Sequence, residues 1–168
     1  MNYKAGVSEI LKSIPWFVDF KPRQIDLLSD ICVVQSIEVN QELFHEGGRE
    51  DCLYIVIEGK LAVDIHIPTQ GDIRIFNAEP LDIIGWSCMT PVVRQRTASV
   101  RALQASQLLC LEAQALHNLC EADHDIGYVI MRRLANVVAS RLLTTRLQLL
   151  DHFVNPNEES LSLKQISE

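Results

Sequence analysis

The sequence lacks several features that mark whole classes of protein. Its five cysteines include no C-x-x-C pair, so the spacing typical of a zinc site or a thiol-exchange motif is missing. No apolar run approaches the roughly 20 residues of a membrane span, and the first residues resemble no signal peptide. We therefore expect a cytoplasmic chain whose cysteines are small buried apolar residues in a reducing compartment.

Positive charge is scarce. The 168 residues hold 15 Lys and Arg against 22 Asp and Glu, which gives a formal net charge of -7. Nucleic-acid binding needs a concentrated basic face that neutralises phosphates. We therefore expect no specific DNA binding by this chain alone. The hydrophobic fraction of 48% is ample for the core of one domain.

Motifs for catalysis and metal binding are also missing. The sequence has no G-x-S-x-G elbow, no H-E-x-x-H and no P-loop lysine, so we expect no enzyme. His117, Cys120 and His124 would share one face of an unbroken helix. A helix break expected near Ala122 and Asp123 would separate them, and we predict no metal site.

Hydrophobic periodicity predicts a mainly β fold with helices at both ends. Helical spacing interrupted by Pro15 and Pro22 predicts two short helices before Cys32. The period then changes to two, which predicts an antiparallel sandwich or barrel. The predicted strands cover residues 32–37, 53–57, 60–67, 73–76, 98–103 and 108–111.

A long helix is predicted from about Asp125 to about His152, because an apolar stripe runs along it. Such a helix is too long for a small barrel to cover, so we predict a homodimer in which two copies pair their helices. The alternative is a helix that lies wholly against its own barrel. The long helix also carries four arginines, which are expected to pair with acidic neighbours or else to dock an acidic partner. They are Arg132, Arg133, Arg141 and Arg146.

Residues 84–100 carry a more specific pattern: Gly85, a short helical turn, and then Arg96-Thr97-Ala98-Ser99-Val100. This order resembles the phosphate-binding cassette of cyclic nucleotide-binding domains, in particular the sensor half of Crp/Fnr-type regulators. The resemblance extends from Leu11 to about Phe153. Leu43–Gly48 is similar to the family's first glycine turn, and Cys52–Gly59 to the strand and glycine that follow it.

The resemblance implies an antiparallel β-roll, a cupin-like jelly roll flanked by N-terminal helices and a long C-terminal helix. The implied parts are N-terminal helices (1–31), the roll (32–112) with its cassette (84–100), helices that include the dimerisation helix (113–153), and a flexible tail or the stub of a further domain (154–168).

The resemblance also implies a set of ligand-binding residues. A glycine lets the backbone approach a ligand, amides of the short turn donate to phosphate oxygens, and an arginine supplies the countercharge. For Arg96 the alternative is a surface ion pair on a strand. The predicted ligand-binding residues are Gly85, Trp86, Ser87, Cys88, Arg96, Thr97, Ala98, Val137 and Val138.

Two departures from the family pattern concern the nucleoside. Trp86 stands where the family has a glutamate that accepts the ribose 2′-hydroxyl, and an indole can only donate. Val137-Val138 stands where the catabolite activator has a Thr-Ser pair that contacts adenine. Trp86 either fills the ribose space or stacks on a different flat anionic ligand held by Arg96.

The resemblance therefore predicts a regulatory effector-sensing domain. It would bind a cyclic nucleotide or another small anion, with cyclic AMP itself bound weakly or not at all. The alternative is a degenerate domain that binds no ligand and serves for dimerisation or protein interaction. No further cofactor is expected.

Overall fold

The computed structural model describes residues 3–49, 51–90 and 95–154. The chain divides into two compact units, residues 1–134 and residues 135–168, and each is described by itself. Helix α4 (His124–Val154) continues across the boundary at Leu134. The predicted tail after residue 154 and the cassette residues 91–94 lie outside the described residues.

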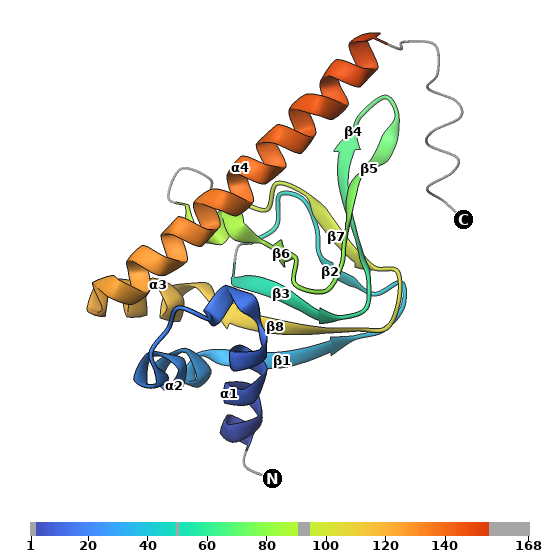
Figure 1. The fold of residues 1–168 in the computed structure, drawn as a ribbon. Coiled ribbons are helices and arrows are strands. Elements are labelled where there is room, and N and C mark those ends of the chain that lie inside the picture. Colours follow the sequence, from blue (N-terminus) through green and yellow to red (C-terminus); the bar gives the residue numbers. More distant parts are fainter. Residues whose placement is uncertain (1–2, 50, 91–94, 155–168) are drawn as a thin grey trace. The chain divides into compact units, whose positions relative to one another are not determined.

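Two antiparallel four-stranded sheets form the roll in the first unit (Figure 1), as the sequence predicts. One sheet has the strand order β1-β8-β3-β6, and the other has the order β2-β7-β4-β5. The strands are β1 (Cys32–Ile37), β2 (Glu42–Phe44), β3 (Cys52–Glu58), β4 (Leu61–Ile67), β5 (Gly71–Ala78), β6 (Ile83–Ile84), β7 (Ser99–Ala102) and β8 (Ser106–Glu112).

All six predicted strands are present, with ends shifted by a few residues. The two that the sequence pattern missed, β2 and β6, hold three and two residues. Such short segments cannot display a two-residue period, so only their partners define them as strands. β6 pairs with β3, and β2 pairs with β7.

The helices of the first unit begin and end at residues that suit those positions. The short helix η1 (Pro15–Phe17) and α2 (Pro22–Asp30) each open on a proline, whose missing N–H is not needed there. They follow α1 (Tyr3–Ser13). The predicted break lies at Asp123, between α3 (Ala113–Ala122) and α4, where the backbone is extended and the side chain accepts from the Ile126 amide at 3.1 Å.

The two faces of the β1-β8-β3-β6 sheet differ in what they contact. The helix-side face, on which α1 and α2 lie beside β1 (Figure 1), has a buried apolar centre. The interior face lines the inside of the roll. Because side chains alternate along a strand, the register assigns each residue to one face. The helix-side face comprises Cys32, Leu53, Ile55, Leu109 and Leu111, and the interior face comprises Cys52, Tyr54, Val56, Leu108 and Cys110.

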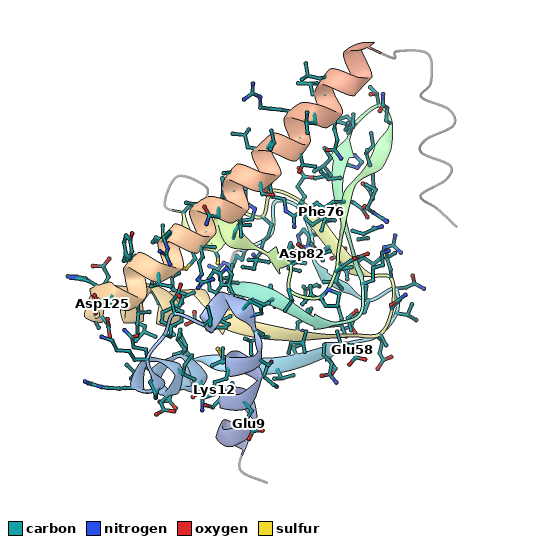
Figure 2. The ribbon with its side chains drawn as sticks, in the orientation of Figure 1. Glu9, Lys12, Glu58, Phe76, Asp82 and Asp125 are labelled. Atoms are coloured by element: carbon teal, nitrogen blue, oxygen red, sulfur yellow. The ribbon has the colours of Figure 1, made fainter. Side chains whose placement is uncertain are left out.

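Charged side chains lie around this core rather than within it. Glu9 and Lys12 on α1, Glu58 at the end of β3 and Asp125 at the start of α4 are all exposed on the outside of the first unit (Figure 2). One charged side chain is an exception. Arg96 is only 2% exposed, which makes its surroundings the first place to look for a site.

Candidate functional site

The backbone of Arg96 is clamped by the glycine turn that precedes β3. The Gly47 amide donates to the Arg96 carbonyl at 2.9 Å, and the Arg96 amide donates to the Gly48 carbonyl at 3.0 Å. The predicted glycine turn and the predicted cassette arginine are thus held together by a reciprocal pair of hydrogen bonds. This pairing directs the Arg96 side chain into the roll instead of toward solvent.

The guanidinium of Arg96 donates to three backbone carbonyls from separate segments. Nε donates to Arg49 O at 3.2 Å, Nη1 to Gly85 O at 3.2 Å and Nη2 to Cys52 O at 2.9 Å. We call this arrangement the Arg96 cage. It joins the loop before β3, the first residue of β3 and the cassette glycine Gly85 around a single cation.

Two aromatic rings complete the cage. The Arg96 guanidinium carbon lies 4.2 Å from the centre of the Phe44 ring and 5.8 Å from that of Tyr54. The two rings are stacked, with centroids 6.0 Å apart. The negative faces of aromatic rings attract cations, and this attraction is stronger where water is excluded. Carbonyl dipoles and ring faces therefore compensate the cost of burying this charge.

Within the described residues, no carboxylate forms an ion pair with Arg96. The alternative of a surface ion pair on a strand is wrong, because the side chain is buried and its bonds go to backbone oxygens. Three of the five guanidinium N–H groups are accounted for by these bonds. The site thus contains a buried positive charge without a carboxylate countercharge.

Gly85 is required at the start of the cassette. Its φ of 74° and ψ of 21° lie in the left-handed region, where L side chains are strained. A Cβ at this position would lie 2.4 Å from Arg96 Nη1 and 2.9 Å from Cys52 O. The position therefore needs glycine both for its backbone angles and for the close approach of the guanidinium.

The remaining predicted ligand residues occupy different environments. The turn η2 (Trp86–Met89) follows Gly85; Ser87 in it is buried, Trp86 is half-buried, and the Cys88 amide donates to Gly85 O at 3.2 Å. Thr97 is exposed, whereas Ala98 packs against the roll core.

Two predicted ligand residues lie in the second unit. Val137 and Val138 are helical residues of α4, and their assignment to the ligand site stays a prediction.

The structure adds residues that the sequence reasoning did not assign to the site. Phe44 and Tyr54 supply the aromatic walls, and Cys52 supplies both a carbonyl and a thiol. Cys110 faces the same space, since β8 pairs Cys110 with Tyr54. The available signal was the position of Phe44 and Cys52 on either side of the Gly47-Gly48 turn that clamps Arg96.

The thiol of Cys52 is the most strongly activated group in this environment. A hydrogen bond from the Cys110 thiol, another from the Tyr54 hydroxyl and the positive charge of Arg96 lower the pKa of Cys52 to about 7, against burial and the charge of Asp51. The pKa of Cys110 is raised well above its usual range, chiefly because its thiol donates to Cys52.

The other cysteine thiols with altered acidity change in the opposite direction from Cys52. Burial raises the pKa of Cys32 to about 12 and that of Cys120 to about 11. Cysteine reactivity depends on the thiolate fraction. Cys52 is therefore chemically distinct from both.

Two predictions about charged and metal-ligating residues can be compared with the structure. Arg132 and Arg133 both pair with Asp19, at 2.9 and 2.6 Å, which confirms that these arginines bind acidic neighbours. His117 and Cys120 lie on α3 and His124 on α4, on either side of the break. Over residues 3–49, 51–90 and 95–154, no cluster of three or more potential ligands could hold a metal ion.

Comparisons with known proteins agree with the fold. Residues 34–123 match the model of the family described as the cyclic nucleotide-binding domain. No curated protein sequence is a match. In the part of the chain that the structure describes, no helix is both long and apolar enough to cross a membrane.

Solved structures of similar fold include three bacterial examples. A cyclic nucleotide-binding domain from Methylobacillus flagellatus KT is 24% identical, with a TM-score of 0.74, over 88% of this chain and 83% of that one. The N-terminal domain of a transcriptional regulator from Streptomyces coelicolor A3(2) is 26% identical, with a TM-score of 0.62. The match covers 83% of this chain and 94% of that one. The sensor domain of the regulator DNR from Pseudomonas aeruginosa is 16% identical, with a TM-score of 0.67, over 97% and 100%.

Proposed function

Because the chain belongs to the cyclic nucleotide-binding domain family, we propose that it is a Crp/Fnr-like regulatory domain that senses a small anionic effector at the Arg96 cage. The observation that carries this proposal is the buried guanidinium, which has no carboxylate partner among the described residues. A buried charge held by neutral dipoles attracts a small anion more strongly than a surface arginine does. The proposed site in the first unit comprises Gly85, Trp86, Ser87, Cys88, Arg96, Thr97 and Ala98.

The effector is expected to differ from cyclic AMP. Trp86 offers an N–H donor where a ribose hydroxyl needs an acceptor, and Val137 and Val138 offer no polar group to a base. A flat anionic molecule that stacks on the Trp86 ring, which is half-buried and next to Gly85, would suit these residues better. Cyclic AMP and cyclic GMP are then expected to bind weakly or not at all.

The signal would travel from the cassette to the helices. η2 contacts both β3 and α3, and α3 leads through Asp123 into α4, so a change in the cassette can move the start of the long helix. Coupling of this kind requires that the ligand favours one of two arrangements.

The far part of α4 is proposed as the dimer interface of a cytoplasmic protein. Residues 135–154 of α4 are the described element of the second unit, so their leucines have no partner element within that unit. A second copy of α4 would bury them as the two helices of a coiled coil bury their apolar seam. The exposed leucines are Leu142, Leu143, Leu147, Leu149 and Leu150.

One observation favours a second candidate function, a dimerisation or interaction module that binds no effector. The Arg96 guanidinium already has three carbonyl acceptors and two aromatic neighbours. A fully enclosed arginine can have a purely structural role, in which its hydrogen bonds hold the glycine turn against the cassette. An effector must displace at least one of these contacts before it can reach the guanidinium.

A ligand screen separates the two functions. Thermal shifts with nucleotides and small anions, followed by calorimetric titration of each hit, are measured on the wild type, Arg96→Ala, Arg96→Lys and Arg101→Ala. Ligands stabilise the folded state by mass action, so a true effector raises Tm. Arg101, a half-buried cation on the adjacent β7, is the matched control.

Each outcome of the screen has a defined meaning. A hit that titrates with the wild type and Arg101→Ala but binds at least tenfold more weakly to Arg96→Lys supports the sensor. Micromolar binding of cyclic AMP to the wild type contradicts the expected effector class. Absence of any titratable hit, together with a dimer in sedimentation analysis, supports the interaction module.

A further inference from the structure

Two cysteines of the interior face lie next to each other on neighbouring strands. β3 and β8 are antiparallel, and Tyr54 stands directly opposite Cys110. Cys52 lies two residues before Tyr54 on β3, so its side chain is on the same face and diagonal to Cys110. The two thiols affect each other electrostatically: the Cys110 thiol lowers the pKa of Cys52, and Cys52 raises the pKa of Cys110.

The surroundings of this pair stabilise a thiolate on Cys52. The guanidinium of Arg96 donates to the carbonyl of the same residue at 2.9 Å, which places a permanent positive charge beside the thiol. The Cys110 thiol, the Tyr54 hydroxyl and the charge of Arg96 lower the pKa of Cys52, whereas burial and the charge of Asp51 raise it. A thiolate on Cys52 would therefore place a negative charge near the Arg96 guanidinium.

The pair is also within reach of small molecules from solvent. Cys52 and Cys110 are half-buried, unlike the fully enclosed Cys32 on the helix-side face. Val33, which stands directly opposite Cys110 on the edge strand β1, is 54% exposed. Since paired residues share a face, the interior face is open to solvent at this end of β1.

We propose that Cys52 and Cys110 form a thiol oxidation site that takes a small hydroperoxide and closes a disulfide between β3 and β8. This site is independent of the proposed effector, because it needs only the two thiols, Arg96 and Tyr54. Neither the family pattern nor the predicted ligand residues require these cysteines as a pair.

The reaction balances in two steps. The Cys52 thiolate attacks one oxygen of the hydroperoxide, an S–O bond forms as the O–O bond breaks, and the other half leaves as an alcohol, or as water from hydrogen peroxide, after taking up a proton. The Cys110 sulfur then attacks the Cys52 sulfenic acid, an S–S bond forms, and the S–O bond breaks to release water. The two thiols together lose two electrons and two protons, and one hydroperoxide is reduced.

Oxidation would alter the Arg96 cage directly. The disulfide is neutral, so it removes the negative charge that a Cys52 thiolate would place near the guanidinium. The bond also fixes the first residue of β3, whose carbonyl accepts from Arg96 Nη2. The redox state of the pair is therefore linked to the charge and geometry of the cassette entrance around Gly85.

The first experiment measures thiol reactivity by mass spectrometry of the full chain. Cys120 is the matched control, since it is half-buried like Cys52 but has a pKa raised to about 11. At pH 7 roughly half of Cys52 and about one in 10⁴ of Cys120 would be thiolate. After the lower nucleophilicity of the more acidic thiol is included, Cys52 is expected to be alkylated on the order of 10²-fold faster than Cys120.

The second experiment uses hydrogen peroxide as the oxidant. Wild type and Cys120→Ser are expected to lose the mass of two hydrogens and to yield a peptide that links Cys52 to Cys110, which dithiothreitol reverses. Cys110→Ser should stop at a sulfenic acid on Cys52 that a dione probe traps, whereas Cys52→Ser should form neither product. Circular dichroism of each variant checks that the roll is intact, and a serine variant that is not intact is replaced by the alanine variant at the same position.

Other results would overturn the proposal. These are alkylation of Cys120 as fast as that of Cys52, a peroxide-induced disulfide between two chains, or a sulfenic acid on Cys52 that persists in the presence of Cys110. None of these outcomes bears on effector binding, which the ligand screen tests separately.

Discussion

The two faces of the β1-β8-β3-β6 sheet differ in chemistry. On the helix-side face, Leu53 pairs with Leu111 and Ile55 with Leu109, and all four side chains are fully buried. On the interior face of the same strands, Tyr54 pairs with Cys110, and Arg96 lies against Tyr54. Neighbouring positions in the sequence therefore alternate between an inert apolar layer and a chemically active one.

The difference separates what holds the fold from what the fold can use. The buried centre of the helix-side face gains its stability from removing apolar area from water, at about 25 cal/mol per Å². The interior face instead depends on hydrogen bonds and charge compensation around Arg96. Substitutions on the first face should change stability alone, and those on the second should also change chemistry.

The largest effect is expected from Leu109→Ala on the helix-side face. Leu109 is fully buried in β8, and its truncation leaves a cavity under the helices. Unfolding by urea should show a loss of about 3 kcal/mol. Val33→Ala on the exposed edge of the interior face should change stability by about 0.5 kcal/mol or less. A loss for Val33→Ala equal to that of Leu109→Ala would remove the distinction between the faces.

The next effect concerns the Arg96 cage. Arg96→Met preserves length but leaves three carbonyls without their donor, and the expected loss is about 2 kcal/mol. Arg96→Lys should lose less, because an ammonium keeps the charge and some of the donors. Urea unfolding of both variants is compared with Arg101→Met; the Arg101 side chain donates to Asn40 Oδ1 at 3.2 Å on the exposed side of β7. A variant Arg96→Met as stable as the wild type would mean that the cage adds no stability.

A smaller effect is expected from Gly85→Ala. A side chain at positive φ costs about 1 kcal/mol, and the new Cβ also meets Arg96 Nη1 at 2.4 Å. Gly71→Ala is the matched control, since its φ is +82° but no atom lies within 4 Å of a Cβ there. The difference between the two variants in urea unfolding reports the close contacts of the new Cβ with the guanidinium and with the Cys52 carbonyl oxygen, which would lie 2.9 Å away. Equal losses would show that the guanidinium moves aside freely.

The longer strands, the helices and the cassette residues Gly85 and Arg96 could be predicted from the sequence. The short strands and the surroundings of Arg96 could not. The two-residue period of β4 and the helical spacing before Pro22 indicate their structures because each reflects local geometry. The cassette pattern also indicated the importance of Gly85 and Arg96. β2 and β6 were missed because their pairing partners, not their own residues, define them.

The sequence could not predict that the Arg96 side chain points into the roll. Its acceptors are backbone carbonyls of Arg49, Cys52 and Gly85, and every residue type carries such a carbonyl. The Cys52–Cys110 pair was hidden for a related reason. Its members are far apart in the sequence, and only the register of β3 against β8 brings them together.

The smallest predicted effect is a pH dependence of stability that arises from Cys32 on the helix-side face. Burial raises the pKa of Cys32 from 9.0 to about 12, so the folded state keeps this proton while the unfolded state loses it. The stabilisation is complete below pH 9 and is lost as pH rises from 9 toward 12. By pH 10 this group alone should lower the free energy of unfolding by about 1 kcal/mol.

The variant Cys32→Ala isolates this contribution from the interior groups. The pKa values of Tyr54 and Cys110 are also raised. These two groups lower the stability at alkaline pH of the wild type and of Cys32→Ala alike. Urea unfolding at pH 8 and pH 10 should therefore show a decline in the variant that is smaller by about 1 kcal/mol. Parallel declines would mean that water reaches Cys32, and the helix-side face would then be as accessible to hydroxide as the interior face.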